Sequence, residues 1–600
     1  MYLRRVHIKN FRNLADFTIE LREGLNVIVG ENNIGKTNIL DAIRAALGPA
    51  STNEFVRLQQ DDLCRTAPKD APIRVDLEFA NLTDEERSDF IDLLNYNSTA
   101  PNLSTASIHC EWRWDTHGRR FTSRRWGGER PDTEAGVPEE VLQNLPVTLL
   151  IALRDAQAAL QPGRQSRVGR LLRTLAGKDD GQKTALETII KTANDGLHEN
   201  ELVKKAQTSI QSVLKAASGP TLGQEAAIQA STPEFERIIN SLRLVVRQPL
   251  SAGESIALLE ELWCNGLGYN NLLYIATVFG ELHAVTSPAL PLLLVEEPEA
   301  HLHPQLQTRL ADYLNGEVVP PGRTVQTIVT THSPTIASHV PVSTLNVLHR
   351  DFSHTLRSAQ CGAFALTDDD EIHLRRLLDV TKAGMLFAKG IIIVEGVTEA
   401  LLLPVLAKRL GISLEDRAVS VVPLWGVEFG TIAKLFGSNK IAIPTALVSD
   451  SDPPIQKKDV WREATFAAGE SSDRMKKLRV SCEGNPVLKL CSSTVTLEYD
   501  LALADAANPA VMTTAWEECF KGQPQNLSSS FLTGLPDHAA TALHLWRVMC
   551  IADSDRKGVF AHRLATNLEK KVNGLFHVPD FGVPQYLKDA IAHAIHEPLT

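Results

Sequence analysis

A glycine-rich loop near the N-terminus constrains the fold of this 600-residue chain more than any other feature. Residues 30–37, GENNIGKT, fit the pattern G-x-x-x-x-G-K-[ST], with an apolar run before them and a helical pattern after them. The two glycines let the backbone curl so that its N–H groups point at phosphate oxygens, and the helix N-terminus adds a partial positive charge. The pattern therefore predicts a strand–loop–helix unit, in an α/β domain, that binds the phosphates of a nucleotide.

Individual residues have distinct roles in this predicted ATP site. Lys36 is expected to reach the β- and γ-phosphates, and the Thr37 hydroxyl to ligate Mg²⁺. The later apolar run LLLV ends in Glu296, expected near the Mg²⁺, and Glu297, expected to orient the attacking water. His332, which follows another apolar strand, can touch the γ-phosphate. The expected nucleotide-binding residues are Gly30, Asn32, Asn33, Gly35, Lys36, Thr37, Asn38, Glu296 and His332.

A second strand–loop–helix pattern begins at 391–404, IIIVEGVTEALLLP. Its apolar strand ends at Glu395, and Glu399 is expected one helical turn later on the same side. Further along, IPTALVSDSDPP ends a strand in Asp450 and Asp452, which strand alternation projects to one side. Taken separately, each pattern also fits a helix N-terminal carboxylate or an Asp-Ser-Asp-Pro turn.

Taken together, the two patterns place four carboxylates at one edge of a predicted parallel sheet. Such a cluster repels itself unless divalent cations neutralise it, and hard oxygen ligands favour Mg²⁺ or Mn²⁺ over zinc. Two ions roughly 3.5–4 Å apart can activate a water and stabilise the leaving oxygen of a phosphodiester. The pattern therefore predicts metal-dependent hydrolysis, with Glu395, Asp450 and Asp452 as catalytic residues and Glu399 as a further metal ligand.

The nucleotide motifs, in this order, resemble the ABC-type ATPase heads of SMC and RecF-like proteins. The opening HIKNFRNL is similar to their first strand, whose Arg12 is expected to face the nucleotide. NGLGYNNLLYIA occupies the place of their signature motif, but L-S-G-G-Q is missing, and only Gly266, Gly268 and Asn270 can stand in for it. The strand before the catalytic acids also ends Glu-Glu rather than Asp-Glu. A transporter-like function is therefore not expected.

The second half resembles a Toprim domain, which has a glutamate after its first strand and Asp-x-Asp after a later one. The V-E-G-x-T-E form after an ATPase head is specifically similar to the OLD family of ATP-dependent endonucleases. Membership implies that Glu498 is a further metal ligand and that Lys557 steadies the scissile phosphate. Without the resemblance, Glu498 is an ordinary strand acid and Lys557 a solvated lysine at a helix start.

The expected fold class is α/β: an ABC-type P-loop ATPase domain with a helical insertion, then a Toprim α/β domain with a parallel central sheet. The insertion is as consistent with a packing subdomain as with an arm for dimerisation. The expected boundaries are 1–168 for the N-terminal part of the ATPase head, 169–240 for the helical insertion as dimerisation element, 241–345 for the C-terminal part of the head, 346–385 for a linker and 386–600 for the Toprim nuclease domain.

The resemblance implies an ATP-regulated endonuclease or nickase that acts on double-stranded DNA with Mg²⁺ or Mn²⁺, as a homodimer or larger assembly. It also implies a role in defence against phage, with a helicase-like partner protein. The alternative is a non-cleaving SMC/RecF-like DNA-binding ATPase of recombination or repair. A topoisomerase is disfavoured because little chain remains for a separate tyrosine-bearing domain.

Composition is consistent with a cytoplasmic protein that does not enter a membrane. No apolar run reaches the roughly 18–20 residues that span a bilayer, and the eight cysteines form no C-x-x-C pair. The net charge of −11 does not exclude DNA as a partner, because local basic patches decide phosphate binding. Residues 111–130 mix tryptophans with arginines; a hairpin packed on the ATPase sheet is favoured over a nucleic-acid surface.

Overall fold

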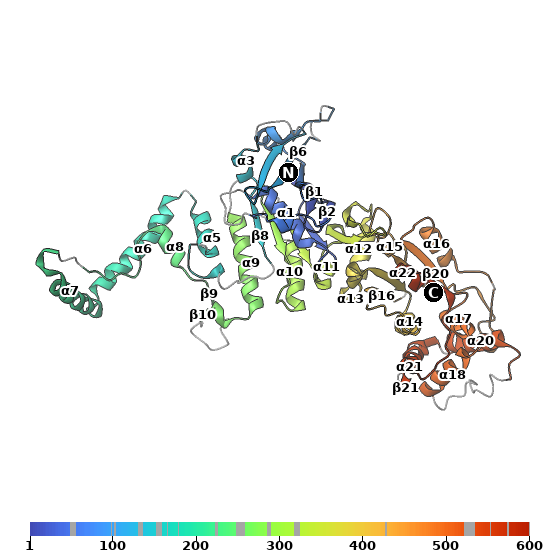
Figure 1. Cartoon of the computed structure of the whole chain (residues 1–600). Coiled ribbons are helices and arrows are strands. Elements are labelled where there is room, and N and C mark those ends of the chain that lie inside the picture. The colour runs from blue at the N-terminus through green and yellow to red at the C-terminus, as the bar shows by residue number, and fades with distance from the viewer. Residues whose placement is uncertain are drawn as a thin grey trace. The chain divides into compact units, whose positions relative to one another are not determined.

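The computed structural model describes most of the chain, and the polypeptide forms two compact units. The described residues are 1–48, 56–97, 99–100, 104–129, 136–151, 159–164, 166–177, 179–222, 226–247, 259–284, 290–316, 325–425, 429–467, 469–520, 534–552, 554–572 and 575–598. The first unit consists of Met1–Gln143, Thr308–Asn315 and Gln326–Thr600, and the second of Asn144–Gln307 and Gly316–Val325. Figure 1 colours the elements along the chain.

The glycine-rich loop follows a central buried strand of the first unit. This strand, β3 (Leu25–Val29), lies parallel to β12 (Gln326–Thr331) on one side and to β13 (Leu345–Arg350) on the other. All five residues of β3, four of them aliphatic and the fifth Asn26, are buried, as expected for a parallel strand covered on both faces. Helix α1 (Lys36–Leu47) begins directly after the loop and buries Ile39, Leu40, Ile43 and Leu47.

An antiparallel sheet covers α1. Its strands are β1 (Tyr2–Phe11), β2 (Leu14–Glu20), β4 (Ile73–Ala80), β6 (Thr105–Asp115) and β7 (Arg120–Gly127), with the short β5 (Leu94–Asn95) at the edge. Side chains alternate strictly along β4, where every second residue is buried. The opposite face of the sheet is polar, so one face packs on the core and the other does not.

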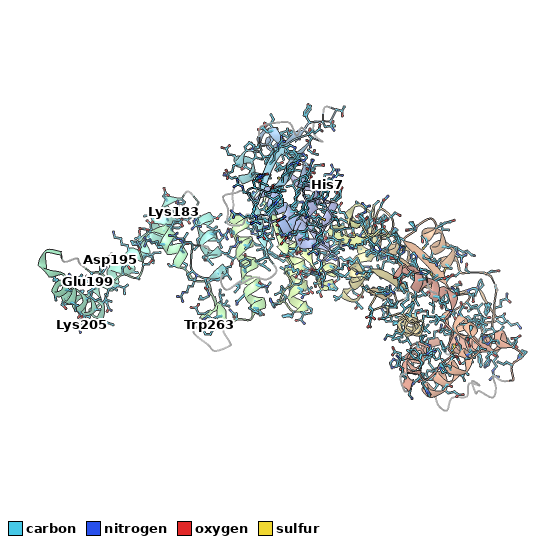
Figure 2. The ribbon with its side chains drawn as sticks, viewed as in Figure 1. His7, Lys183, Asp195, Glu199, Lys205 and Trp263 are labelled. Carbon is cyan, nitrogen blue, oxygen red and sulfur yellow. The ribbon has the colours of Figure 1, made fainter. Side chains whose placement is uncertain are left out.

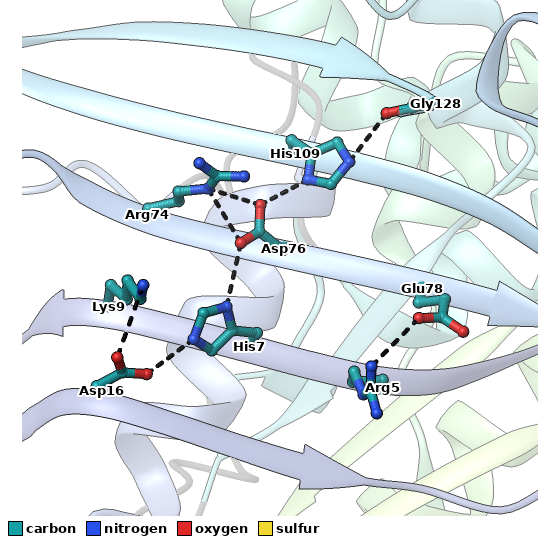
Figure 3. A network of polar contacts seen from close by, with 9 residues as sticks. All are labelled: Arg5, His7, Lys9, Asp16, Arg74, Asp76, Glu78, His109 and Gly128. Carbon is teal, nitrogen blue, oxygen red and sulfur yellow. Dashed lines mark hydrogen bonds and ion pairs between the residues drawn. The ribbon is translucent and has the colours of Figure 1, made fainter. Parts of the chain in front are cut away.

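That polar face carries a hydrogen-bonded network centred on Asp76 (Figure 3). The Asp76 carboxylate contacts His109 Nδ1 at 2.6 Å, Arg74 Nε at 2.9 Å and His7 Nδ1 at 3.3 Å. The other ring nitrogen of His7 lies 2.8 Å from Asp16 Oδ1. The network ties β1, β2, β4 and β6 together on the side away from the core.

A second parallel sheet forms the centre of residues 386–598, which we call the C-terminal domain. Its strand order is β16-β15-β17-β20, and all neighbouring strands are parallel. Because the strands are parallel, their carboxyl ends meet at one edge of the sheet. The strands span Val419–Pro423 for β16, Gly390–Val394 for β15, Thr445–Ser449 for β17 and Leu488–Ser492 for β20.

Helices around this sheet supply the rest of the domain core. Helix α14 (Val397–Arg409) follows β15, and α21 (Lys557–Glu569) packs against it. The C-terminal helix α22 (Gln585–Ile595) contacts β15, β17 and β20. Buried aliphatic side chains of these elements form one continuous hydrophobic cluster. Within the described residues, no helix combines the length and the apolar character that crossing a membrane requires.

The second unit contains two parallel strands and a set of helices. Strand β8 (Val147–Leu150) pairs with β11 (Leu292–Glu296). Helices α6 (Asp180–Glu199) and α7 (Glu201–Leu222) form a largely exposed pair, marked in Figure 2 by Lys183 and Lys205. Large apolar side chains such as Ile189 and Leu202 are exposed on these two helices.

The sequence pattern at 346–385 does not indicate regular elements, but the structure contains several there. Strand β13 joins the β3 sheet, and β14 (Leu356–Gln360) pairs with it in antiparallel orientation. Helix α12 (Asp368–Leu377) follows, with Thr367 capping its N-terminus. Lys434 of the C-terminal domain donates hydrogen bonds to both oxygens of Asp370 on α12, at 2.7 and 2.8 Å. The segment therefore contains regular secondary structure, and its role as a linker between the two domains stays a prediction.

Candidate functional site

The carboxyl edge of the C-terminal sheet gathers the acidic side chains that the sequence singles out. Glu395 directly follows β15, and Glu399 lies in the first turn of α14, where its Oε2 accepts a hydrogen bond from the Gly396 N–H at 3.1 Å. Asp450 directly follows β17. The Ser449 hydroxyl, at the end of β17, donates to Glu395 Oε2 at 2.9 Å and so joins the two strand ends.

Asp450 and Asp452 occupy different environments, although both follow the same strand. Asp450 Oδ1 accepts hydrogen bonds from the Leu497 N–H at 2.9 Å and from the Ser493 hydroxyl at 3.1 Å. Asp452 has a positive φ of 42° and a half-exposed side chain. The backbone turns between them, so Asp450 is held inward and Asp452 lies at the rim.

Glu498 and Lys557 form a buried ion pair at the inner side of the cluster. Glu498 lies in the first turn of α17 (Leu497–Ala504), and its side chain is 2% exposed. Lys557 Nζ, at the start of α21, lies 3.3 Å from each Glu498 oxygen. The Cys550 thiol donates to Glu498 Oε2 at 3.2 Å from a π-helical turn, Arg547–Ala552. The two residues that the family resemblance added therefore contact each other.

Arg474 lies at the outer side of the cluster and was not identified from the sequence. It comes from α16 (Asp473–Cys482), and its Nη2 donates to Glu395 Oε2 at 2.8 Å. The same nitrogen lies 3.5 Å from Asp452 Oδ2. One guanidinium therefore links the first strand end to the rim of the second.

Burial and mutual repulsion shift the ionisation of the inner carboxyls. Burial, reinforced by the charges of Glu498 and Glu395, raises the pKa of Glu399 to about 7. Burial also raises the pKa of Asp450 well above its usual value, with Glu498 and Glu399 adding to the effect. Burial alone would raise the pKa of Glu395 too, but Arg474 and the hydrogen bonds from Ser449 and the Asp450 backbone together outweigh it, so the pKa of Glu395 is lowered. The negative charges of the inner carboxylates therefore repel one another, which favours the protonated forms of Glu399 and Asp450.

The donor chemistry of this cluster fits a hard divalent cation. The atoms of the cluster that can ligate a cation are carboxylate and hydroxyl oxygens, apart from the Cys550 thiol, and such oxygens are the preferred ligands of Mg²⁺ and Mn²⁺. In the described part of the chain, no three His, Cys, Asp or Glu side chains are arranged to hold one metal ion. Arg474 and Lys557 instead supply positive charge to the two sides of the cluster. Shared cations at these carboxylates stay a prediction.

The residues that sequence reasoning missed here are of common types. Ser449 precedes Asp450 in the chain, so its position at the strand end could have been noticed. Ser493 follows β20 in the same way that Asp450 follows β17, and only the sheet order brings the two together. Arg474 and Cys550 carry no local pattern, because nothing near them in the sequence marks them.

The glycine-rich loop has the conformation that its motif requires. Gly30 and Gly35 have φ values of +154° and +121°, which disfavour any side chain. Lys36 Nζ donates to the carbonyl oxygens of Gly30 at 2.7 Å and Glu31 at 2.8 Å. His332 Nδ1 lies 3.2 Å from the same ammonium, so β12 brings His332 to the predicted phosphate site.

Other residues predicted for the nucleotide site have clear structural partners. Arg12 forms ion pairs of 2.7 Å with Asp41 and with Asp62, and it donates to Asn38 Oδ1 at 2.8 Å. Arg12 and Asn38 are therefore linked to each other. The N-termini of β2 and α1 are joined by a further hydrogen bond, from Asn38 to Asn13.

The remaining ATPase motifs lie in the second unit. Glu296 ends β11, and Glu297 adopts a positive φ of 41° directly after it. In the signature region, Asn270 is buried and its Nδ2 donates to the Leu262 carbonyl at 2.8 Å, so this side chain holds the start of α9 (Leu267–Ala284) in place. Trp263, just before that helix, is 74% exposed (Figure 2).

The tryptophan–arginine stretch forms the hairpin of β6 and β7. Trp112 and Trp126 are buried, and the Arg74 and Arg124 guanidiniums each lie 5.5 Å from the Trp126 ring. Arg113 pairs with Glu111 at 2.7 Å. These tryptophans pack on the sheet, as the favoured interpretation expects; Arg130 lies outside the described residues.

Comparisons with known proteins match both halves of the chain. The model of an AAA ATPase domain matches residues 1–216 and 176–337, and that of an overcoming lysogenization defect protein-like TOPRIM domain matches residues 386–452. The OLD nuclease of Thermus scotoductus is 27% identical over 472 residues, which cover 75% of this chain and 82% of the relative. The DNA replication and repair protein RecF of Teredinibacter turnerae is 34% identical over 126 residues, only 18% of this chain and 33% of that protein.

Two solved structures, one of an OLD protein and one of an SMC head, show a weak likeness to parts of the chain. The C-terminal region of the Burkholderia pseudomallei OLD protein has a TM-score of 0.26 at 22% identity, covering 35% of this chain and 98% of that one. An SMC head bound to the C-terminal winged-helix domain of ScpA has a TM-score of 0.35 at 17% identity, covering 60% of this chain and 98% of that one.

Proposed function

Because the chain belongs to the OLD family, in which an AAA ATPase domain is combined with an OLD-like Toprim nuclease domain, we propose that it is an ATP-regulated endonuclease that cuts or nicks double-stranded DNA. The observation that supports this proposal most directly is the acidic cluster at the carboxyl edge of the C-terminal sheet. The strand ends of β15 and β17 and the first turns of α14 and α17 contribute to it, and burial raises the pKa of three of its carboxyls, those of Glu399, Asp450 and Asp452.

The acidic side chains are the proposed ligands of Mg²⁺ or Mn²⁺. When bound, such ions supply an activated water and neutralise the leaving oxygen of a phosphodiester in a two-metal mechanism. The proposed metal-binding residues are Glu395, Glu399, Asp450, Asp452 and Glu498. Of these, Glu395, Asp450 and Asp452 are the proposed catalytic ligands.

Two cationic side chains have proposed roles toward the DNA backbone. The guanidinium of Arg474, at the rim, matches a phosphate group in shape and charge, so it can orient the backbone. Lys557 lies deeper, and its ammonium would steady the scissile phosphate, while Glu498, which it contacts in this structure, would help to hold the cation. Ser449 and Ser493 orient Glu395 and Asp450, respectively.

The N-terminal half is proposed to bind ATP with Mg²⁺. Lys36 would extend to the β- and γ-phosphates, Thr37 would ligate Mg²⁺ and His332 would contact the γ-phosphate. Glu296 and Glu297 are proposed to serve the Mg²⁺ and the attacking water. We further propose a homodimer or larger assembly, supported by the apolar side chains exposed on α6 and α7. A role in phage defence, with a helicase-like partner, belongs to the same proposal.

Plasmid cleavage tests the nuclease proposal. Supercoiled plasmid is incubated with Mg²⁺ or Mn²⁺ and with the native chain or its Asp450→Ala/Asp452→Ala variant. The native chain is expected to nick or linearise the plasmid, and the variant to leave it intact. Asp473→Ala removes an acid of the same domain that is 92% exposed, so this control should cut like the native chain.

The absence of plasmid cleavage would favour the second candidate function. Plasmid that stays intact with the native chain under both metals, with or without ATP, would transfer the proposal to a non-cleaving SMC/RecF-like DNA-binding ATPase. The nucleotide site is tested separately by ATP binding to Lys36→Ala, which is expected to be much weaker. Equal ATP affinity in that variant would show that the loop is misassigned.

A further inference from the structure

Strand β13 contacts the glycine-rich loop on one side and the C-terminal domain on the other. A Cβ at Gly30 would come within 2.7 Å of the Leu348 carbonyl oxygen, so the loop lies directly on this strand. The next residue, His349, is buried, and its Nε2 accepts a hydrogen bond of 3.1 Å from the Ala442 N–H. Two consecutive residues of β13 therefore link the phosphate loop to the segment that leads into β17.

An ion pair forms a second link between the loop and the C-terminal domain. Lys389 Nζ lies 3.4 Å from Glu31 Oε2, and Lys389 directly precedes β15. Both links border one cavity of about 350 Å³, which is also lined by the β13–β14 turn and the end of α22. A cavity at this place gives the loop room to shift without a clash.

The two links reach the strands that carry the catalytic carboxylates. Lys389 lies at the amino end of β15, and Glu395 follows its carboxyl end. Ala442 lies before the amino end of β17, and Asp450 follows its carboxyl end. Each strand has five fully buried residues, which span about 17 Å, and a buried strand moves as one piece. A shift at the amino edge is therefore transmitted to the acidic cluster.

Nucleotide binding would act on this junction through Lys36. Its ammonium donates to the carbonyl of Glu31, and the same ammonium is the group that a P-loop lysine extends to the phosphates. Phosphates therefore compete with the hydrogen bond that holds the Glu31 peptide. The backbone of Glu31 is therefore held less firmly when nucleotide is bound than when it is absent. The position of the Glu31 side chain, and with it the ion pair to Lys389, changes between these two states.

We propose that the Glu31–Lys389 ion pair and the Leu348–His349 segment couple nucleotide binding to the acidic cluster of the nuclease site. The proposal deepens the proposed function by naming the route of its regulation, and it rests on that function only for the cleavage measurement. Coupling of this kind is reciprocal, so occupation of either site changes affinity at the other by the same factor. A partly exposed ion pair is expected to contribute a factor of about two to five to this change in affinity, which corresponds to about 0.4–1 kcal/mol.

Charge reversal at Lys389 tests the proposal without altering either site. Hydrogen exchange is measured at constant Mg²⁺, with and without ATPγS, in segments 386–394 and 442–449, and plasmid cleavage is measured in parallel. The native chain is expected to show a nucleotide-dependent change in both segments and in the cleavage rate. Lys389→Glu should reduce the nucleotide-dependent ratio of cleavage rates by about two- to fivefold and shrink the exchange difference in 386–394, while Lys389→Arg should keep both.

A matched control and two distinct failures complete the test. Lys408→Glu breaks an ion pair of 3.3 Å with Glu569 inside the C-terminal domain and should leave the nucleotide effect unchanged. The coupling proposal is overturned if ATPγS changes neither segment of the native chain, or if Lys389→Glu responds like the native chain. A plasmid that no variant cuts would instead remove the nuclease proposal, and the exchange data would still decide the coupling.

Discussion

Removing the charge of Lys557 is expected to destabilise the acidic cluster of the C-terminal domain by a calculable amount. Lys557 Nζ lies 3.3 Å from both oxygens of Glu498, whose side chain is 2% exposed. In Lys557→Met, the Cys550 thiol still donates to Glu498 Oε2, but a thiol does not neutralise the charge of the carboxylate. Breaking a buried ion pair from one side costs about 3–5 kcal/mol. We expect about 3 kcal/mol, because the Lys557 side chain is itself 28% exposed.

Hydrogen exchange measures this loss within the domain concerned. At 1.36 kcal/mol for each factor of ten, a loss of about 3 kcal/mol speeds the exchange of the slowest amides by about 150-fold. The effect should appear in α17 and α21 when EDTA is present. The double variant Lys557→Met/Glu498→Gln removes the unpaired charge and should return exchange to within about tenfold of native. Lys476→Met, which removes an exposed lysine of the same domain, should change exchange less than about threefold.

Repeating the hydrogen-exchange measurement with Mg²⁺ in place of EDTA tests whether the cluster binds a divalent cation. If Glu498 helps to hold a cation, Mg²⁺ replaces the lost positive charge and should restore much of the protection in Lys557→Met. Native exchange rates in Lys557→Met under EDTA would refute the argument that the pair offsets buried charge. Fast exchange that Mg²⁺ does not slow would refute the argument that these carboxylates share a divalent ion.

Three further predictions follow from other contacts. Arg474→Ala should lower kcat for plasmid cleavage by about 100-fold with a smaller change in KM for DNA, and Arg474→Lys should recover part of it; equal kcat values would remove Arg474 from the site. Gly390→Ala should destabilise the C-terminal domain by about 3 kcal/mol, because its Cβ would lie 2.0 Å from the Ala594 carbonyl oxygen, whereas Gly430→Ala, with nothing within 4 Å, should be neutral in thermal unfolding. Burial lowers the pKa of His349 in the folded chain, so the contribution of this residue to stability is present above the unfolded-state pKa of about 6.5 and is lost as the pH falls below that value. Between pH 7 and 5, the Tm of His349→Gln should therefore fall less than the Tm of the native chain. Parallel plots of Tm against pH for the two proteins would contradict this.

Local patterns were sufficient wherever the chemistry is carried by neighbours in the chain. The glycine-rich loop could be predicted together with its strand and helix, because the motif and its flanks are contiguous. The strand ends at Glu395 and Asp450 could be predicted for the same reason. The parallel arrangement of β15 and β17 followed from the apolar runs, since strands buried on both faces lack polar alternation.

Local patterns failed where the partner of a residue is distant or of a common type. The segment 346–385 has no clear periodicity, yet β13 forms there because the edge of β3 offers a partner strand. Arg474 lies 79 residues from the glutamate that it binds, so no spacing rule could mark it. Taken without the family resemblance, the sequence predicts Glu498 as a strand acid, whereas it lies in the first turn of helix α17, whose first residue, Leu497, donates its backbone N–H to Asp450.

The amino-acid sequence alone determined that a glycine-rich loop between a strand and a helix, and two buried strands that end in acidic residues, exist, because each of these depends on contiguous residues and on burial that a short pattern records. Only the tertiary structure decided how the acids are distributed: Asp450 is held inward, Asp452 lies at the rim, Glu395 binds Arg474 and Glu498 binds Lys557. It also decided that the glycine-rich loop is linked to the residues that precede β15 and β17, directly through the Glu31–Lys389 ion pair and indirectly through His349 of β13. These contacts depend on which surfaces pack together, and packing is a property of the whole fold rather than of any segment.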